Sequence, residues 1–337
     1  MKNARIVAIE YHLPGEILDT ARLSAEHPGW NADKLDQASG IRQRRIAAAG
    51  ECASDLAVAA AEKLFATGLL HREEVDFLLF CTQSPDFLVP TTACLIQHRL
   101  GLPSSCGAVD YSLGHSGYVY GLGLAAGLIA SGQANTLLLL TGETYSRYIH
   151  PEDKSSRVIF GDAGTATLIR ATDEAGTMGP FVYGTDGSGA ENIMVPAGGA
   201  RLPRTQATAL AQTDENGNTR SENDLRMNGA EVFSFTLAAV PASVQQLLER
   251  AGCEMSEIDA FVFHQSNRYI LEHLRKKCGI PREKFLVALE ECGNTVSNSI
   301  PLALKLCRER GQLMPDQLLA LVGYGAGFSW GAALVRW

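Results

Sequence analysis

The chain has 337 residues, of which 46% are hydrophobic and 20% are charged, a composition typical of a globular protein with a large core. Its formal net charge of -8 disfavours nucleic acid as a partner, because the summed field of the protein would repel a polyanion. The eight cysteines form neither a Cys-x-x-Cys pair nor a cluster at metal-ligand spacing, so the sequence predicts free thiols and no metal site.

The N-terminus and the longest apolar stretch indicate neither export nor a membrane span. The first ten residues resemble a strand and lack the apolar core of a signal peptide. Residues 119–130 are too few and too rich in glycine to cross a bilayer. We therefore expect a cytoplasmic protein with no membrane partner.

The predicted elements recur in the same order in the two halves of the chain. A helix over 54–65 precedes a buried strand within 74–84, and a helix over 242–251 precedes a similar strand within 257–266. Two further pairs of strands keep this order, at 135–142 and 317–323, and at 166–170 and 332–336. These pairs predict a duplicated α/β unit with halves 1–171 and 172–337, whose sheets are covered by helices on both faces.

Residues 172–226 are rich in glycine, threonine, asparagine and aspartate, which is turn chemistry. The sequence predicts a long, loop-rich excursion between the halves. A segment of this length is either a surface loop or part of a binding site, and both interpretations stay open.

An apolar helix is predicted over 119–131, directly after the segment 110–118. A helix that is apolar all round is buried. His115 would lie at its N-terminus, where free amides and the positive end of the helix dipole disfavour an imidazolium. The sequence therefore predicts a neutral imidazole, with either a structural or a chemical role.

Two polar residues of the second half stand where strands and turns lead into helices. His264 ends a strand and precedes the predicted helix 269–278, a position at which α/β folds carry ligand chemistry. Asn294 lies in a polar turn before the apolar helix 300–306, and taken alone it is also a common turn residue.

The loop 323–331 is dense in glycine and lies between two predicted strands. It indicates either a tight sheet crossing or backbone amides directed at an oxyanion. It is not a phosphate loop, because no Gly-Lys-Ser/Thr sequence follows.

Together these segments resemble the type III ketoacyl-acyl-carrier-protein synthases of the thiolase superfamily over nearly the whole chain. The motifs are Ser39-Gly-Ile-Arg-Gln-Arg-Arg-Ile46, Pro90-Thr-Thr-Ala-Cys94, Phe160-Gly-Asp-Ala-Gly164, His264-Gln-Ser-Asn267, Gly293-Asn-Thr295 and 323–337. The resemblance implies a thiolase-like α/β fold of five αβαβα layers with two pseudo-duplicated halves, and a homodimer. It also implies an acyl thioester of acyl carrier protein or coenzyme A as substrate, with no cofactor.

The resemblance also assigns roles to residues. His264 and Asn294 match the family's histidine and asparagine, which hydrogen-bond the thioester carbonyl of a malonyl-type donor and stabilise the enolate that decarboxylation leaves. The backbone amides of His115 and Ala326 match the oxyanion hole, and Phe160 matches a residue of the substrate tunnel.

The sequence departs from the family at the nucleophile, because Gly114-His-Ser-Gly117 stands where relatives carry Gly-Cys-Ser-Gly. No acyl-cysteine can form at residue 115, and Cys81 and Cys94 lie elsewhere in the pattern. We expect His115 to act as a general base rather than to be acylated, since acyl-imidazoles hydrolyse readily. Ser116, one residue further on, would point about 100° away along the helix.

The carrier is predicted from altered contacts and from a basic helix. Lys34, Ala38 and Lys154 replace family residues that bind coenzyme A, which favours acyl carrier protein as the carrier. Its docking site would be four basic residues on one short helix, the alternative being a solvated helix face. These residues are Arg268, Arg275, Lys276 and Lys277.

Three interpretations of residue 115 stay open. The chain is an acyltransferase that moves or condenses an acyl group in a fatty acid, polyketide or related pathway without an acyl-cysteine. Alternatively it is a catalytically silent pseudoenzyme subunit that pairs with an active paralogue, or an engineered Cys-to-His variant of a condensing enzyme. The retention of His264 and Asn294 favours the first interpretation.

Overall fold

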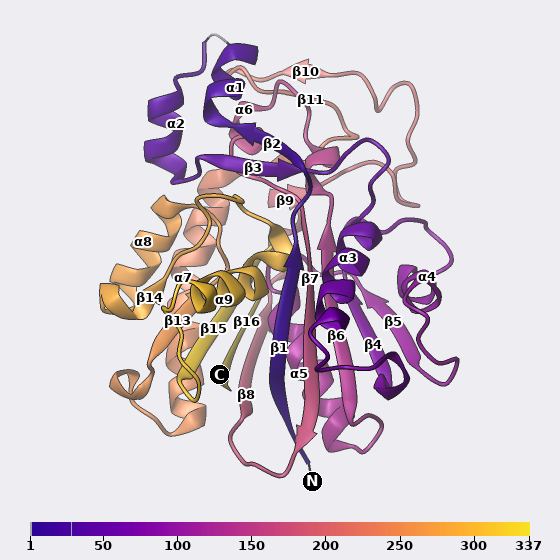
Figure 1. Cartoon of the computed structure of the whole chain (residues 1–337). Coiled ribbons are helices and arrows are strands. Elements are labelled where there is room, and N and C mark those ends of the chain that lie inside the picture. Colours follow the sequence, from indigo (N-terminus) through magenta and orange to yellow (C-terminus); the bar gives the residue numbers. More distant parts are fainter. Residues whose placement is uncertain (1, 28) are drawn as a thin grey trace.

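The computed structural model describes residues 2–27 and 29–337, and its centre is a pair of five-stranded sheets (Figure 1). The first sheet has the strand order β1 (Asn3–His12), β7 (Ala163–Thr172), β6 (Thr136–Glu143), β4 (Phe77–Cys81) and β5 (Gly107–Tyr111). The second has the order β14 (Phe285–Leu286), β13 (Ala260–Phe263), β15 (Leu318–Gly325), β16 (Ser329–Arg336) and β8 (Met178–Thr185).

The two sheets repeat one pairing pattern. In the first sheet β4 runs parallel to β5 and β6, and β6 runs antiparallel to β7. In the second sheet β13 runs parallel to β14 and β15, and β15 runs antiparallel to β16. The predicted duplicated architecture is therefore confirmed, whereas the division of the chain at residue 171 stays a prediction.

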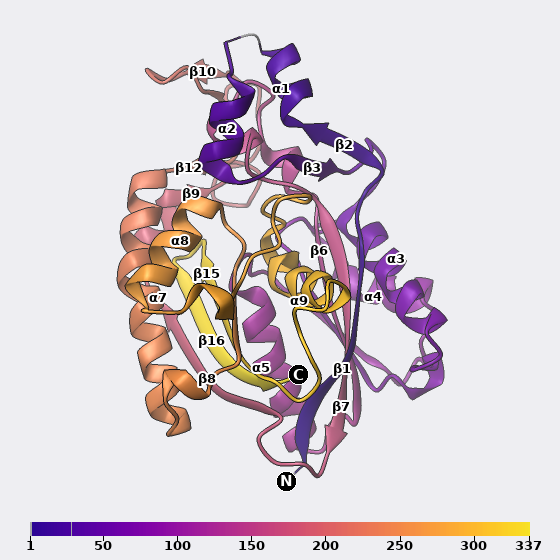
Figure 2. The same ribbon diagram turned by 60° about the vertical axis from the view of Figure 1, so that its left-hand side comes forward.

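Helices separate and cover the sheets in five layers, as Figure 2 shows. The middle layer consists of α5 (Gly117–Ala130) and α9 (Ser299–Glu309). The outer face of the first sheet carries α3 (Ala53–Ala66) and α4 (Thr92–Arg99), and the outer side of the second carries α7 (Gly229–Ala251) and α8 (Arg268–Lys277). This arrangement confirms the predicted αβαβα fold.

Glycines let α5 lie close to the strands around it. A Cβ atom at Gly121 would stand 2.2 Å from the hydroxyl of Tyr111, and one at Gly123 would stand 1.7 Å from the hydroxyl of Tyr183. Any larger side chain would force the helix outward. Seven of the 14 residues of α5 are buried, whereas Leu124 is 47% exposed, so the helix is not buried on every side as its composition predicted.

The remaining elements cap one end of the sheets. They comprise β2 (Glu16–Asp19), α1 (Thr20–Glu26), α2 (Ala32–Ser39), β3 (Gln43–Ile46), α6 (Lys154–Arg157), β9 (Ile193–Met194), β10 (Gln212–Thr213), β11 (Thr219–Arg220) and β12 (Arg226–Met227). Figure 1 shows the hairpins of this cap above the core. Arg220 fixes the excursion to α6 through a 2.7 Å ion pair with the fully buried Asp153.

Two sequence expectations need correction. Residues 172–226 are not a loop-rich excursion throughout, because β8 is a full strand of the second sheet and pairs with β16. The helix expected over 242–251 begins at Gly229, because it continues through Pro241, where the sequence suggested a boundary.

Candidate active site

His115, His264 and Asn294 come together at one cavity of about 300 Å³. His115 precedes α5, His264 follows β13, and Asn294 lies in the turn before α9, so the two central helices and a strand end position all three. The side chains are 4%, 1% and 4% exposed. The two imidazole ring centres lie 4.6 Å apart with their planes at 78°.

His115 is a buried and neutral imidazole. Burial lowers its pKa from 6.5 to about 4, and Nδ1 has no hydrogen-bond partner among the described residues. The ring lies against Gly325, where a Cβ atom would stand 2.5 Å from Nδ1. A larger residue at 325 would therefore displace the imidazole.

His264 is held by one strong contact. Its Nδ1 lies 2.6 Å from the hydroxyl oxygen of Ser299, the first residue of α9. Burial first, and then the neighbouring His115, hold the pKa of His264 well below its usual value. With the Ser299 hydroxyl as donor, the ring hydrogen is on Nε2, the nitrogen left for the cavity.

Asn294 keeps its amide hydrogens available. The backbone N–H of Val296 donates to its Oδ1 at 2.9 Å, and Nδ2 has no partner among the described residues. Its main chain is paired on both sides, because its N–H donates to Ile159 and its carbonyl accepts from Gly161. The amide is therefore presented as a fixed donor, and its backbone is joined to the segment that carries Phe160.

The amides proposed for an oxyanion hole are free to donate. The backbone N–H groups of His115 and Ala326 reach no acceptor within the described part of the chain. Ala326 follows β15 in the glycine-dense loop, and this loop approaches the helix closely, since a Cβ at Gly323 would stand 2.7 Å from the Cα of Ser116. The loop therefore approaches the helix closely and carries the amide of Ala326, which is unpaired among the described residues, and its role at an oxyanion stays a prediction.

An aromatic wall closes the site beside His115. The ring centre of Phe160 lies 6.3 Å from that of His115, and that of Tyr145 lies 6.2 Å away. The sequence analysis missed Tyr145, although its place directly after a strand of the first sheet was a usable signal. Its hydroxyl donates to the side chain of Gln83 at 3.3 Å.

Cys81, Cys94 and Ser116, the thiols and the hydroxyl that the sequence analysis considered beside His115, are not placed as free nucleophiles. The Cys81 thiol donates to the carbonyl of Leu113 at 2.9 Å, and burial raises its pKa far above the usual value, so it stays protonated. Cys94 is exposed on α4. The hydroxyl of Ser116 is buried and hydrogen-bonded to Ser329 at 2.7 Å.

Glu143 is a fully buried carboxyl that the sequence analysis missed. The hydroxyls of Ser84 and Ser297 each donate to it at 2.8 Å, and the backbone N–H of Gln83 donates at 3.1 Å. Burial outweighs these bonds and raises its pKa from 4.5 to about 8. Because Ser297 belongs to the turn of Asn294, this carboxyl joins both halves of the site.

The cavity leads from the two histidines towards α8. Apolar side chains of Met227, Val232 and Phe233 line one side, while Asn267 and Tyr269 contribute from the start of α8. An extended ligand with a mostly apolar stem fits this lining.

The four basic residues of α8 are not equally available. Arg268 is exposed and lies across Gly40, where a Cβ atom would stand 2.6 Å from its own Cβ. Arg275 is only 16% exposed, because it pairs with Glu272 at 2.7 Å. Lys276 is 69% exposed and Lys277 is also exposed.

An unpredicted aromatic residue accompanies Lys154. Its Nζ lies 5.9 Å from the ring centre of Trp30, which stacks on His27 at 4.1 Å. Ser155, the next residue, lines the cavity. Lys154 and Trp30 therefore form a basic and aromatic pair next to a residue that lines the cavity.

Comparisons with known proteins agree with this architecture. Residues 109–187 match the family 3-oxoacyl-[acyl-carrier-protein (ACP)] synthase III, and residues 248–337 match its C-terminal part. The chain is 39% identical to β-ketoacyl-[acyl-carrier-protein] synthase III 3 of Streptomyces coelicolor over 301 residues, 89% of this chain and 87% of that protein. It is 34% identical to β-ketoacyl-[acyl-carrier-protein] synthase III of Clostridium perfringens over 336 residues, 100% of both chains.

Solved structures give the same result. A crystal structure of a 3-oxoacyl-(acyl-carrier-protein) synthase III has a TM-score of 0.98 at 50% identity, covering 99% of this chain and 100% of that one. The priming β-ketosynthase of the R1128 polyketide biosynthetic pathway has a TM-score of 0.85 at 25% identity, covering 99% of this chain and 97% of that one. No helix within the described ranges is long and apolar enough to cross a membrane.

Proposed function

Because the chain belongs to the 3-oxoacyl-[acyl-carrier-protein] synthase III family of condensing acyltransferases, we propose that it transfers or condenses an acyl group without an acyl-cysteine intermediate. The donor is a thioester of acyl carrier protein or coenzyme A. The observation that carries the proposal is a neutral His115, 4.6 Å from His264, in a cavity that leads towards the basic helix α8.

The proposed chemistry is direct attack on the thioester. His115 takes a proton from the acceptor as the acceptor attacks the carbonyl carbon, and the amides of His115 and Ala326 stabilise the oxyanion that forms. When the oxyanion collapses, the carbon–sulfur bond breaks, the leaving sulfur takes the proton from His115, and it departs as a thiol. Because the pKa of His115 is only about 4, the imidazole passes this proton on rather than retaining it.

With a malonyl-type donor, the same site supports decarboxylation. The bond to the carboxylate breaks, carbon dioxide leaves, and the electron pair forms an enolate. His264 and Asn294 supply the hydrogen-bond donors for the enolate oxygen, through Nε2–H and Nδ2–H. The contact of Ser299 with Nδ1 fixes the His264 ring, and the N–H of Val296 fixes the Asn294 side chain through Oδ1. Both donors are therefore oriented before the reaction, and they need little reorganisation during it.

The proposed carrier is an acyl carrier protein that docks on α8. Arg268, Lys276 and Lys277 are exposed there, on a protein whose net charge is -8. A local basic patch of this kind attracts an acidic partner and orients its approach. Arg275 is paired with Glu272 and is largely buried, so it is less available to a partner than the other three basic residues.

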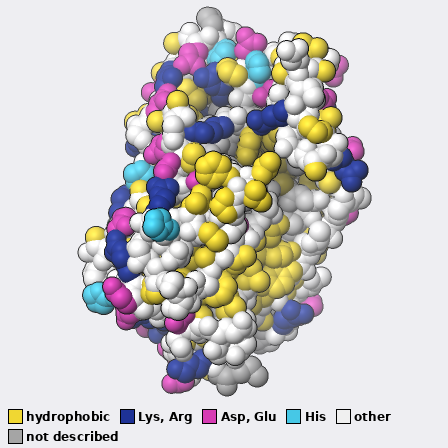
Figure 3. Space-filling view, turned by 90° about the vertical axis from the view of Figure 1, so that its right-hand side faces the viewer, with side chains coloured by type: hydrophobic (Ala, Val, Ile, Leu, Met, Phe, Trp, Pro, Cys, Tyr) yellow, Lys and Arg dark blue, Asp and Glu magenta, His cyan; other side chains and the backbone are white. Residues whose placement is uncertain are grey.

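We also infer that a second copy of the chain covers the β5 side of the molecule. β5 is the edge strand of its sheet, and Val109 on it is 42% exposed. Phe87, Leu88 and Val89 are 59%, 89% and 82% exposed, and Figure 3 shows hydrophobic side chains gathered on the side that lies at the right of Figure 1. An unpaired edge beside such a patch is typical of an interface.

A second candidate function follows from the absence of an available thiol. No cysteine of the described ranges lines the cavity, and burial keeps the Cys81 thiol protonated. A catalytically silent subunit that pairs with an active paralogue would have this arrangement. The fixed donors of His264 and Asn294 favour the active enzyme.

Intact-protein mass spectrometry combined with a thiol-release assay separates the candidates. The native chain is mixed with a panel of acyl thioesters of coenzyme A and of acyl carrier protein. Direct transfer predicts thiol release without a mass adduct, and loss of release in His264→Ala. A native chain that is silent, while His115→Cys becomes acylated and turns over, would identify the silent subunit.

A further inference from the structure

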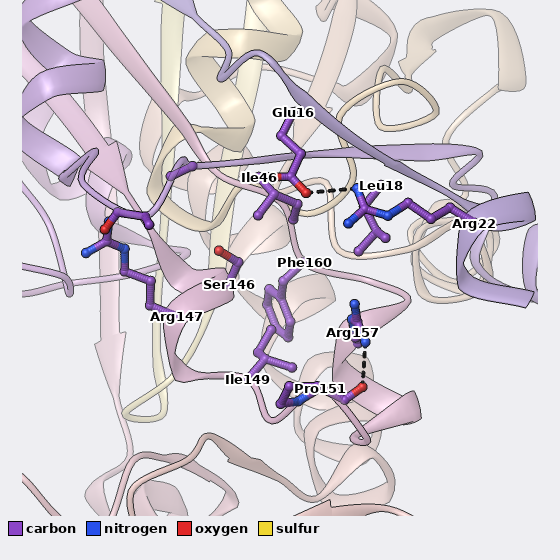
Figure 4. Close-up of a pocket in the computed structure, with 12 residues that line it drawn as sticks. Glu16, Leu18, Arg22, Ile46, Ser146, Arg147, Ile149, Pro151, Arg157 and Phe160 are labelled. Carbon is purple, nitrogen blue, oxygen red and sulfur yellow. Dashed lines mark hydrogen bonds and ion pairs between the residues drawn. The ribbon is translucent and has the colours of Figure 1, made fainter. Parts of the chain in front are cut away.

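A second cavity, of about 460 Å³, shares Phe160 with the cavity of the two histidines and no other described lining residue. The hairpin of β2 and β3, the helix α1 and the segment 146–157 enclose it. Figure 4 shows Ile46 and Leu18 above the Phe160 ring, with Ser146 and Arg157 on either side of it. The reaction proposed above uses none of this space.

The floor of this cavity is apolar and its rim is basic. Ile46 and Ile149, both half-buried, supply most of the accessible apolar surface, whereas Leu18 and Phe160 border the cavity at only 4% and 2% exposure. The basic rim consists of Arg22, Arg147 and Arg157. A cavity of this size with an apolar body and few charged groups has the general character of a small-ligand site.

The charges at the rim leave one positive charge unbalanced. Glu26 pairs with Arg22 and with Arg157, and Glu16 also pairs with Arg22. Three arginines therefore face two carboxylates. The unbalanced cation is Arg147, which makes no ion pair among the described residues.

Arg147 is fixed on one side and free on the other. Its Nη2 donates to the backbone carbonyls of Ala48, Ala49 and Glu51 at 3.1, 3.1 and 2.6 Å. Its Nε and Nη1 have no hydrogen-bond partner in the described part of the chain. A guanidinium held in this way is preorganised to bind a further anion, and a single excess charge matches a monoanion.

Phe160 connects this cavity with the catalytic one. Its ring lines both, and the ring centre lies 6.3 Å from that of His115. The residues on either side of it, Ile159 and Gly161, hydrogen-bond the backbone of Asn294. A ligand behind the ring therefore contacts a side chain that also borders the catalytic imidazole.

We propose that the second cavity binds a small amphipathic carboxylate, with its aliphatic chain against Ile46 and Ile149 beside Phe160 and its head group paired with Arg147. The ligand is either a free acid or the distal carboxylate of a longer substrate. This proposal does not depend on the activity proposed above, because it concerns binding in a separate cavity.

Calorimetric titration of the full chain with octanoate tests the proposal, with octanol as a neutral ligand of the same chain length. Octanoate is expected to bind, and Arg147→Gln is expected to weaken it about tenfold, which corresponds to one charge-assisted hydrogen-bonded pair. Arg282→Gln, at an exposed arginine outside the cavity, is the matched control and should leave binding unchanged.

Two further measurements complete the test. Octanoate should shift the NMR signal of the His115 imidazole, identified with a His115→Gln variant, because Phe160 lines both cavities and its ring centre lies 6.3 Å from that of His115. Competition by a pantetheine thioester whose acyl chain ends in a carboxylate would assign the site to the substrate, and lack of competition would assign it to free acids. Equal affinity for octanol and octanoate, or equal octanoate affinity in Arg147→Gln and the native chain, would overturn the proposal.

Discussion

Glu143→Gln tests whether burial of a carboxyl between the two halves of the site makes stability depend on pH. Glu143 is fully buried, and three donors reach it from Gln83, Ser84 and Ser297. The amide of the substituted side chain has nearly the same shape, and it can accept from Ser84 while it donates to Ser297. The substitution therefore removes the ionisable group and retains most of the contacts.

The expected magnitude follows from the pKa of Glu143, which is 4.5 as the reference value and about 8 in the folded protein. Below pH 4.5 the carboxyl is protonated in both states and contributes no difference. Between pH 4.5 and 8 the unfolded chain releases the proton and the folded chain retains it, so the free energy of unfolding falls as pH rises. At about 1.4 kcal/mol for each unit of pKa, the full effect above pH 8 is about 5 kcal/mol.

Urea denaturation of the native chain and of Glu143→Gln, at pH 5 and at pH 8.5 and at one protein concentration, measures the effect. The free energy of unfolding of the variant minus that of the native chain should rise by several kcal/mol from pH 5 to pH 8.5. Contributions of His115 and His264 cancel, because both proteins retain them. Glu62→Gln, which changes an exposed carboxylate, is the control. A difference between the two proteins that stays constant with pH within about 0.5 kcal/mol would refute the reasoning.

Four further outcomes are expected. Since burial lowers the pKa of His115 to about 4, the pH profile of kcat should show no loss between pH 7 and 5, and a limb near pH 6.5 would contradict a neutral base. Ser299→Ala should lower kcat about tenfold with little change in KM, and Ser299→Thr should restore it, because this hydroxyl orients His264. Lys276→Glu should raise KM for an acyl-carrier-protein thioester and leave a pantetheine thioester unaffected; equal effects on both would contradict docking on α8. Light scattering should detect a dimer of the native chain and a monomer of Val109→Lys, and an unchanged mass would contradict pairing through β5.

Several parts of the fold could be predicted from the sequence because they depend on local patterns. The paired apolar runs predicted three strands of each sheet, β4, β6 and β7 in the first and β13, β15 and β16 in the second, since a buried strand needs a short continuous apolar segment. The apolar composition of 119–131 predicted a buried helix, which corresponds to α5 of the structure. The position of His115 before that helix, and of His264 after a strand, predicted two polar groups at element ends.

Other elements were missed because their partners are distant in the sequence. β8 has an ordinary composition and becomes part of the second sheet only by pairing with β16, about 150 residues away. The contact of His264 with Ser299 and the bonds of Glu143 to Ser297 likewise join separate segments. No periodicity or motif records such contacts.

The sequence by itself determined the duplicated α/β architecture, and it singled out three of the polar residues at the cavity, His115, His264 and Asn294. The tertiary structure decided their chemistry, because a pKa depends on burial and on neighbours that the chain brings together only when it folds. Burial makes His115 neutral and Cys81 inert, and it keeps Glu143 protonated near neutral pH. The cavity behind Phe160 exists for the same reason, since three separate segments enclose it.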